Sequence, residues 1–192
     1  MDATQRDILL QFLWTQGEVD AIDSPEKFRE WLLGLGLIEP DVPVTEDDVR
    51  FARRFRAATR SLCASHSGFE LDPRTRPLFD QLNAEAPLQV TVTEDRQLAL
   101  LPGGSGVKRA LSTILALLYS AETSGEFDRF KTCKACGWAF YDESKNASKK
   151  WCDMGACGTR SKMKAYRERK KALSSQPTGA ITAPAASGQP AS

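Results

Sequence analysis

Four of the chain's five cysteines lie in two short pairs, and this pattern constrains the fold more than any other feature of the sequence. Two residues separate Cys133 from Cys136, four separate Cys152 from Cys157, and fifteen residues lie between the pairs. Two close thiolate pairs joined by a loop that can fold back are typical of a tetrahedral four-cysteine zinc site. We therefore predict a small unit in which bound zinc, Zn2+, takes the place of a hydrophobic core.

The remaining sequence favours metal binding over disulfide formation for these cysteines. It has no apolar leader flanked by positive charges and no run of about 18 apolar residues, so it indicates neither secretion nor a membrane span. We expect a cytoplasmic protein, in which close cysteine pairs stay reduced. Sulfur ligands without a nearby histidine favour zinc, with an iron–sulfur cluster as the alternative. A redox-active C-x-x-C pair fits less well, because a second pair follows and no βαβ pattern surrounds the first.

Charge is distributed very unevenly along the chain. Residues 129–171 contain thirteen Lys or Arg against four Asp or Glu, whereas the net charge of the whole chain is only +1. Such asymmetry predicts a polyanionic partner for the basic segment. The candidate nucleic-acid-binding residues in this segment are Lys145, Lys149, Lys150, Arg160, Lys162, Lys164, Arg167 and Arg169.

The sequence before the cysteine pairs has helical periodicity with one strand pair. Apolar residues at helical spacing and capping signals predict helices over residues 4–16, 25–35, 45–62, 73–87 and 107–125, and alternation predicts a β-hairpin over residues 88–101. We therefore predict a mainly α (α+β) protein. Its parts are a helical N-terminal domain with one β-hairpin over residues 1–125, a four-cysteine zinc finger ending in a basic helix over residues 126–173, and a disordered tail over residues 174–192.

Three features that resemble functional motifs have simpler explanations. Five arginines surround the predicted helix over residues 45–62, and the acidic domain around them predicts a solvated or salt-bridged surface. The sequence PGGSG over residues 102–106 lacks the spacing and the Lys of a phosphate-binding loop, so we predict a flexible link. Cys63 and His66 lack further ligands for a second metal site.

Within the finger, each residue type has a physical task. Gly137 permits the tight turn of a C-x-x-C pair, and Trp138, Phe140 and Trp151 supply apolar cover. A basic helix is predicted to begin at Gly158, directly after the last cysteine.

The finger sequence is similar to that of a known family. Residues 140–167 read F-Y-D-x-S-K-N-x-S-K-K-W-C-x-M-x-x-C-G-T-R-x-K-x-x-x-Y-R, which resembles the CGNR-type zinc finger of bacterial proteins whose N-terminal helical domain is called ABATE. The resemblance implies a treble-clef-like or ribbon-like finger, Cys133, Cys136, Cys152 and Cys157 as zinc ligands, DNA binding by the finger, and a stress-induced transcription regulator.

The chain departs from the family pattern at a few positions. Thr159 stands where the family name has Asn, and Lys149 and Lys150 stand where arginines are common; near the first helix, Trp14 replaces an asparagine. Lysine cannot form the bidentate pair that arginine makes with guanine, so these two lysines suit phosphate contact better than base reading.

Two functional hypotheses follow from the sequence. The first is a zinc-dependent transcriptional regulator that binds double-stranded DNA through its finger and basic helix, with an N-terminal domain for effector sensing or oligomerisation. The second is a zinc-stabilised module that docks on RNA or on a protein such as RNA polymerase or another regulator. We predict no enzymatic activity, because four thiolates leave zinc without an open position. Arg160 is expected either to read a base or to brace the finger through a backbone carbonyl or a carboxylate such as that of Asp142. The oligomeric state stays open.

Overall fold

The computed structural model describes residues 1–14 and 20–174. The elements in order are helices α1 (Ala3–Trp14), α2 (Pro25–Gly34), α3 (Glu46–Ser65) and α4 (Thr75–Glu85), strands β1 (Leu88–Val92) and β2 (Leu98–Pro102), helix α5 (Gly106–Thr123), the 3-10 turn η1 (Phe127–Arg129), strands β3 (Phe130–Thr132) and β4 (Ala139–Tyr141), the π-helical turn η2 (Met154–Gly158) and helix α6 (Thr159–Ser174). The predicted mainly α class with a single N-terminal β-hairpin is confirmed. The predicted end of the first helix at residue 16, and the predicted disordered tail from residue 175 onward, lie outside the described residues.

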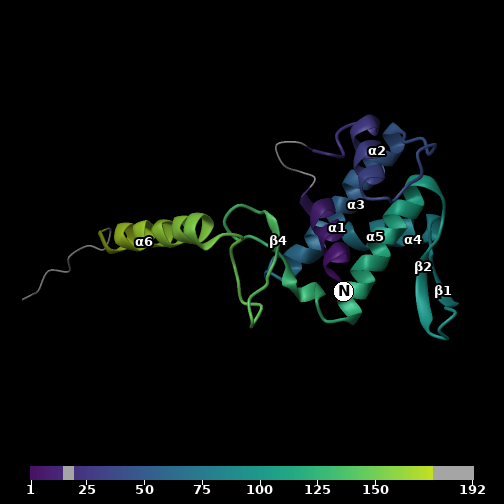
Figure 1. Ribbon diagram of the computed structural model, residues 1–192. Helices are drawn as coiled ribbons and strands as arrows, with labels where there is room; N and C mark the ends of the chain where they lie inside the picture. The colour runs from purple at the N-terminus through teal and green to yellow at the C-terminus, as the bar shows by residue number, and fades with distance from the viewer. Residues whose placement is uncertain (15–19, 175–192) are drawn as a thin grey trace, which may run out of the picture.

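The main core lies between α1, α3 and α5, which run beside one another in Figure 1. Phe12 of α1 and Phe55 of α3 are fully buried, with ring centroids 5.7 Å apart, and Leu111 and Ile114 of α5 are fully buried in the same cluster. Burial of each such side chain contributes about 1.5–3 kcal/mol relative to exposure. The apolar stripes that predicted these helices therefore form one core.

Local sequence signals set two helix starts as predicted. Ser24 caps α2 by accepting a hydrogen bond from Lys27 N, and Pro25 occupies the first turn. Thr45 and Asp48 form a capping box at the start of α3, in which each side chain accepts from the other residue's backbone N–H.

The arginines of α3 are largely bound, which supports the salt-bridge interpretation. Arg50 pairs with Asp47 and Arg53 with Asp23. Arg56 does not lie on the solvated surface that was predicted for these arginines, because only 5% of its surface is exposed. It donates two hydrogen bonds, of 2.7 and 3.1 Å, to the carboxylate of Asp20.

The predicted flexible link after the hairpin is a tightly packed turn. Strands β1 and β2 pair antiparallel with Val90 opposite Leu100, and the chain then turns at Gly103 and Gly104. A Cβ atom at Gly103 would lie 2.3 Å from the carbonyl oxygen of Pro87. Glycine is therefore required by close backbone packing rather than for flexibility.

The segment after α5 packs into the same core as the N-terminal helices. Phe127, Phe130 and Ala139 belong to the main hydrophobic cluster, and β3 and β4 contact α1 and α3. The predicted domain boundary at residues 125 and 126 stays a prediction, but the first strands of the finger are physically part of the N-terminal core.

Polar contacts fix this docked arrangement. The Trp14 indole donates to the carbonyl of Ala139 at 2.5 Å and its ring stacks on Trp138 with centroids 6.2 Å apart. Arg60 of α3 donates both to the carbonyl of Leu13, at 2.7 Å, and to that of Gly137, at 3.0 Å. The first cysteine pair is thus held by the helical domain as well as by its own loop.

The end of α3 supplies further contacts to β3. His66 Nδ1 lies 3.1 Å from the carbonyl oxygen of Phe130, and the Thr132 N–H donates to Ser67 Oγ at 3.0 Å. The Cys63 side chain is fully buried in the main core, where burial raises the pKa of its thiol to about 12. Cys63 and His66 therefore have structural roles, as expected.

Candidate metal centre

The first cysteine pair lies in the turn between β3 and β4. Gly137 follows Cys136 with a φ of +74°, a left-handed conformation that glycine adopts without strain, so the predicted role of this glycine is confirmed. Its N–H donates to the carbonyl of Cys133 at 2.9 Å, and the Cys133 N–H donates to the carbonyl of Trp138 at 2.8 Å. These bonds close the turn and direct both thiols to the same side.

The second pair lies at the entrance to the basic helix. Cys157 is in η2, which continues directly into α6. Asp153 begins this turn, since its carboxylate accepts from the N–H of Ala156 and its carbonyl accepts from Gly158 at 3.0 Å. A ligand at the start of a helix, opposite a hairpin turn, is the treble-clef-like form of the predicted finger.

The four sulfur atoms are brought together at the spacing that one metal ion requires. All four ligand atoms lie within 4.8 Å of one another. Cys136 Sγ is 3.7 Å from Cys152 Sγ, which is 3.8 Å from Cys157 Sγ. Sulfurs at about 2.3 Å from a tetrahedral zinc ion lie about 3.8 Å apart. An iron–sulfur cluster distributes its cysteines over several irons and needs a wider arrangement.

The electrostatics of the thiols also call for a cation. Burial opposes ionisation of Cys133, but backbone N–H groups of Cys152, Ala135 and Cys136 outweigh it and lower the pKa of that thiol to about 6. Burial and the neighbouring sulfurs raise the pKa of Cys152. The surroundings thus favour the thiolate at Cys133 but oppose it at Cys152, and a bound metal ion would supply the positive charge that favours thiolates.

A small apolar shell surrounds the cysteines, as the sequence predicted. Cys133, Phe140 and Cys157 are buried together, with Trp138 and Trp151 packed against them. The Trp151 indole also donates to Ser161 Oγ of α6 at 3.0 Å, which joins the loop to the basic helix. The metal site thereby fixes where the basic helix begins.

The loop between β4 and the second pair is organised by Asp142, whose side chain is fully buried. Its carboxylate accepts from Lys131 Nζ at 3.0 Å, from Ser144 Oγ at 2.6 Å and from the backbone N–H of Lys149 at 2.8 Å. Burial opposes ionisation of Asp142, but these bonds outweigh it and lower its pKa well below the usual range. The position of Lys149 is therefore set by a buried carboxylate.

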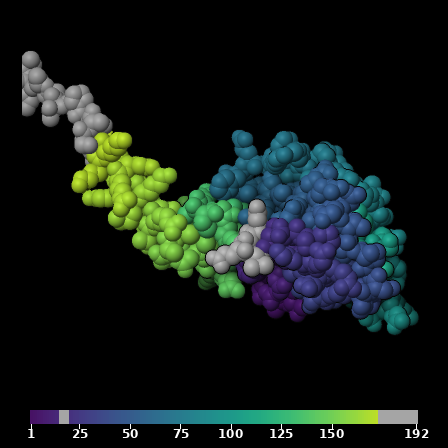
Figure 2. Space-filling model, turned by 90° about the horizontal axis from the view of Figure 1, so that it is seen from above, coloured from purple at the N-terminus to yellow at the C-terminus, as the bar shows by residue number. Residues whose placement is uncertain are grey.

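The predicted nucleic-acid-binding residues are all exposed and fall into two groups. Lys145, Lys149 and Lys150 lie on the loop before Cys152, while Arg160, Lys162, Lys164, Arg167 and Arg169 lie on α6. Helix α6 extends away from the rest of the protein in both Figure 1 and Figure 2, and its residues 162–172 are all exposed. A helix that is exposed on every side beyond its first turn, and that carries mostly positive side chains, is suited to an external partner.

The sequence prediction missed Lys134, which connects these two groups. Lys134 is exposed between the first two cysteines and lines two grooves. One groove also contains Lys149 and Lys150, and the other contains Arg160 and Lys164. Its backbone N–H donates to the carbonyl of Lys150 at 3.0 Å. A basic residue between the first two cysteines was the signal in the sequence that could have identified Lys134.

Helical geometry also divides the α6 residues. Arg160, Lys164 and Arg167 recur at intervals of four and three residues, so they share one face of the helix. Lys162 and Arg169 lie on the opposite face. We define the basic face as the surface formed by Lys134, Lys149, Lys150, Arg160, Lys164 and Arg167.

Arg160 does not brace the finger in this structure. Asp142 is bound by Lys131, Ser144 and Lys149, and within residues 1–14 and 20–174 the Arg160 guanidinium has no hydrogen bond or ion pair. The expected alternative, in which Arg160 braces the finger through a backbone carbonyl or a carboxylate such as that of Asp142, is therefore wrong.

The fold and the site together define a protein class: a helical domain onto which a four-cysteine, single-metal finger with a basic helix is docked. Comparison with known families agrees. The CGNR zinc finger family matches residues 129–170, and the ABATE family, described as "Putative stress-induced transcription regulator", matches residues 6–121. Because the second match spans more than half of the chain, the protein belongs to the ABATE family and carries a CGNR zinc finger.

A search of curated proteins gave no match. In the part of the chain that the structure describes, every helix is too short or too polar to cross a membrane.

Proposed function

We propose that the protein is a zinc-dependent transcriptional regulator that binds double-stranded DNA through its basic face. The observation that carries the proposal is the continuity of this face, which runs from Lys134 in the first cysteine turn to Arg167 on α6. Phosphate groups are the ligands that such a surface attracts most strongly. The family description points to the same role.

The dimensions and charge of α6 support DNA as the partner. Its 16 residues give a length of about 24 Å, and the major groove, about 12 Å wide, admits a helix. Glu168 is the one acidic residue among seven Lys or Arg in this helix, so two copies of α6 would repel each other. A polyanion would therefore neutralise the positive charge of α6, whereas a second copy of α6 would add to it.

The metal has a structural role in this proposal. Four thiolates at the spacing of a tetrahedral zinc ion leave no position for water or substrate, so we propose no catalytic activity. Zinc, when bound, joins the turn that carries Lys134 to the turn that begins α6. The reduced thiols fit a cytoplasmic location, where the N-terminal domain would sense an effector or form oligomers.

Salt dependence of binding tests the basic face. Lys164→Ala on the basic face should reduce the magnitude of the log–log salt slope by about 0.9, whereas Lys162→Ala should leave it unchanged. The two variants remove the same charge from the same helix two residues apart, so they are matched. Equal slopes for both variants, measured by fluorescence anisotropy on duplex DNA with zinc-loaded protein, would contradict the proposed face.

Selection of genomic fragments by the zinc-loaded protein tests sequence preference. On a selected site, Arg160→Lys should weaken binding by about tenfold or more and should change binding to random duplex much less, because lysine cannot pair bidentately with guanine. Equal weakening on both duplexes would leave Arg160 as a phosphate contact. Failure of the wild-type protein to bind any duplex would contradict the proposal and favour the RNA- or protein-interaction module.

A further inference from the structure

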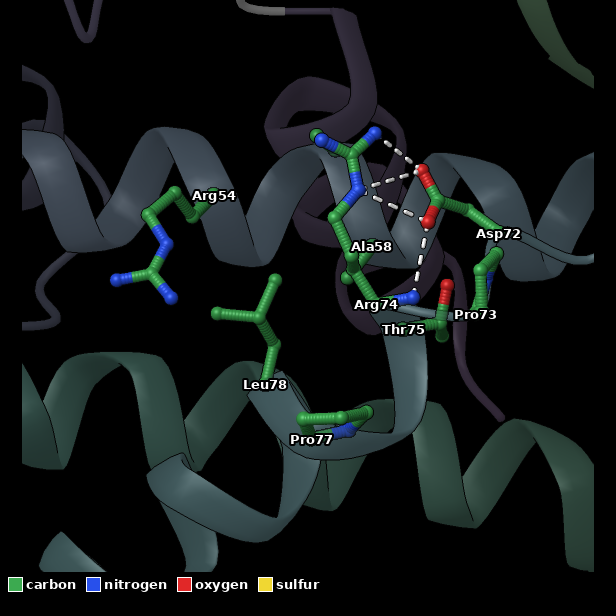
Figure 3. Close-up of a pocket in the computed structure, with 9 residues that line it drawn as sticks. Arg54, Ala58, Asp72, Pro73, Arg74, Thr75, Pro77 and Leu78 are labelled. Carbon is green, nitrogen blue, oxygen red and sulfur yellow. Dashed lines mark hydrogen bonds and ion pairs between the residues drawn. The ribbon is translucent and has the colours of Figure 1, made fainter.

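A pocket in the helical domain lies apart from the metal centre. It has a volume of about 360 Å³ and lies between α3 and the turn that leads into α4, as Figure 3 shows. Volumes of about 300–1,000 Å³ are typical of small-molecule sites. Its lining residues are Arg54, Ala57, Ala58, Asp72, Pro73, Arg74, Thr75, Pro77 and Leu78.

The centre of this pocket is apolar and its edges are charged. Ala58 of α3 and Leu78 of α4 both line the pocket, and Pro77 lies below Leu78 in Figure 3. Arg54 stands at one edge, and Asp72 with Arg74 stands at the other. A ligand that fills the pocket therefore needs an apolar body and meets charge at its ends.

The two edges of the pocket differ in net charge. Asp72 accepts hydrogen bonds from the Arg74 side chain at 3.0, 3.2 and 2.6 Å, and these bonds lower the pKa of Asp72 to about 2. This ion pair is internally neutral. It therefore offers no net charge to a ligand.

Arg54 provides the uncompensated charge. The neighbouring arginines of α3 bind carboxylates or backbone carbonyls, but the Arg54 guanidinium has no hydrogen bond or ion pair within the described ranges 1–14 and 20–174. Arginine pairs bidentately with carboxylates in a geometry that ammonium groups cannot reproduce.

The wall of the pocket also contains an unsatisfied polar group. Thr75, at the start of α4, is 4% exposed, and its Oγ1 is a buried side-chain oxygen without a hydrogen-bond partner among the described residues. Because this oxygen is itself inaccessible, it offers no contact to a molecule in the pocket.

We propose that this pocket binds a small amphipathic carboxylate, with its apolar body against Ala58 and Leu78 and its carboxylate on Arg54. The inference deepens the effector-sensing part of the proposed function by assigning the site and the chemical class of the effector. It also places the effector on α3, the helix whose Arg60 donates to Gly137 of the finger and whose C-cap residue, His66, contacts Phe130. Binding of a small carboxylate can be measured in the absence of DNA, so the result is independent of whether the protein binds DNA.

The experiment compares three probes on the full-length, zinc-loaded protein by NMR of labelled methyl groups. Phenylacetate has both an apolar ring and a carboxylate, phenylacetamide is its neutral counterpart, and acetate lacks the ring. We expect phenylacetate to shift the methyl signals of Ala57, Ala58 and Leu78 in a saturable manner. The other two probes should bind at least about tenfold more weakly, since a charged hydrogen-bonded pair and apolar burial each contribute that much.

Three variants locate the interaction. Arg54→Gln should remove the preference for phenylacetate over its amide. Ala57→Leu should fill the pocket from an exposed helix position, without disturbing the core, and abolish the shifts. Arg50→Gln is the control, since it lies one turn away on α3, pairs with Asp47 and does not line the pocket.

Each of the following outcomes would contradict the proposed carboxylate site. Equal binding of phenylacetate and phenylacetamide would show that the Arg54 charge is not used. Equal binding of phenylacetate and acetate would show that the apolar centre is not used. Absence of methyl shifts with phenylacetate, or loss of binding in Arg50→Gln to the same extent as in Arg54→Gln, would remove the pocket as the site.

Discussion

Replacement of Arg60 by methionine tests whether the finger is held by the helical domain. The Arg60 guanidinium joins the last turn of α1 to the first cysteine turn, because it donates to the carbonyls of both Leu13 and Gly137. Methionine keeps an unbranched apolar stem of similar length, so the variant removes the two hydrogen bonds and little packing. The four cysteines are untouched, and we expect unchanged zinc content.

The expected loss follows from the bond that crosses to the finger. Arg60 and Leu13 both belong to the helical domain, so undocking the finger breaks only the bond from Arg60 to Gly137. Hydrogen bonds to charged groups contribute about 1.5–3 kcal/mol each, and the half-buried position of the Arg60 side chain favours the lower end, about 1.5 kcal/mol. This value corresponds to an increase of about tenfold in the population of molecules with an undocked finger.

Hydrogen exchange measures this population directly. The Thr132 N–H donates to Ser67 Oγ across the interface, so its exchange reports undocking. We expect about tenfold faster exchange at Thr132 in Arg60→Met. Arg50→Met is the matched control because its ion pair with Asp47 is exposed, and removal of such a pair costs at most about 1 kcal/mol. Identical Thr132 exchange in the two variants would refute the docking role of Arg60.

Three further predictions concern the metal, the partly buried carboxylate of Asp20 and the buried carboxylate of Asp142. Cys133→Ser should lose bound zinc in metal analysis while Cys63→Ser retains it, and equal zinc contents would refute the ligand assignment. Asp20→Asn should lower the free energy of unfolding in urea by about 2–3 kcal/mol at pH 7, because it removes the charged partner of a buried arginine. Burial opposes ionisation of Asp20, but the bonds from Arg56 outweigh it and lower its pKa, so its contribution is complete above the unfolded pKa of about 3.9 and is lost as pH falls below it. The difference between wild type and Asp20→Asn should shrink below about pH 4, and a difference that grows there would contradict the assignment. Asp142→Asn should destabilise the protein by about 3 kcal/mol and expose its loop to proteolysis, and unchanged cleavage would show that another group organises the loop.

The sequence predicted the features that depend on local patterns. The cysteine spacing predicted the cluster of sulfurs, and the signals at Ser24 and Thr45 predicted the starts of two helices. These features are encoded by residues a few positions apart. Helical geometry alone would also have placed Lys162 and Arg169 away from the basic face.

Docking of the finger was not predictable from the same patterns. Trp14 and Ala139 are 125 residues apart, and Arg60 binds backbone carbonyls, which every residue provides whatever its side chain. Neither the spacing of apolar residues nor a sequence motif predicts such contacts. The pocket beside Arg54 depends in the same way on how α3 and α4 pack, and it becomes visible only in three dimensions.

The position of Phe130 and Ala139 in the main core has a consequence for biosynthesis. As the chain leaves the ribosome, α1, α3 and α5 emerge first, and the apolar surface between them that these two residues cover stays exposed to water until β3 and β4 follow. The same stretch of nascent chain carries the first cysteine pair. Closure of the core and capture of the metal thus follow the emergence of the helices, and a chain truncated before β3 would be an unfinished and aggregation-prone helical bundle.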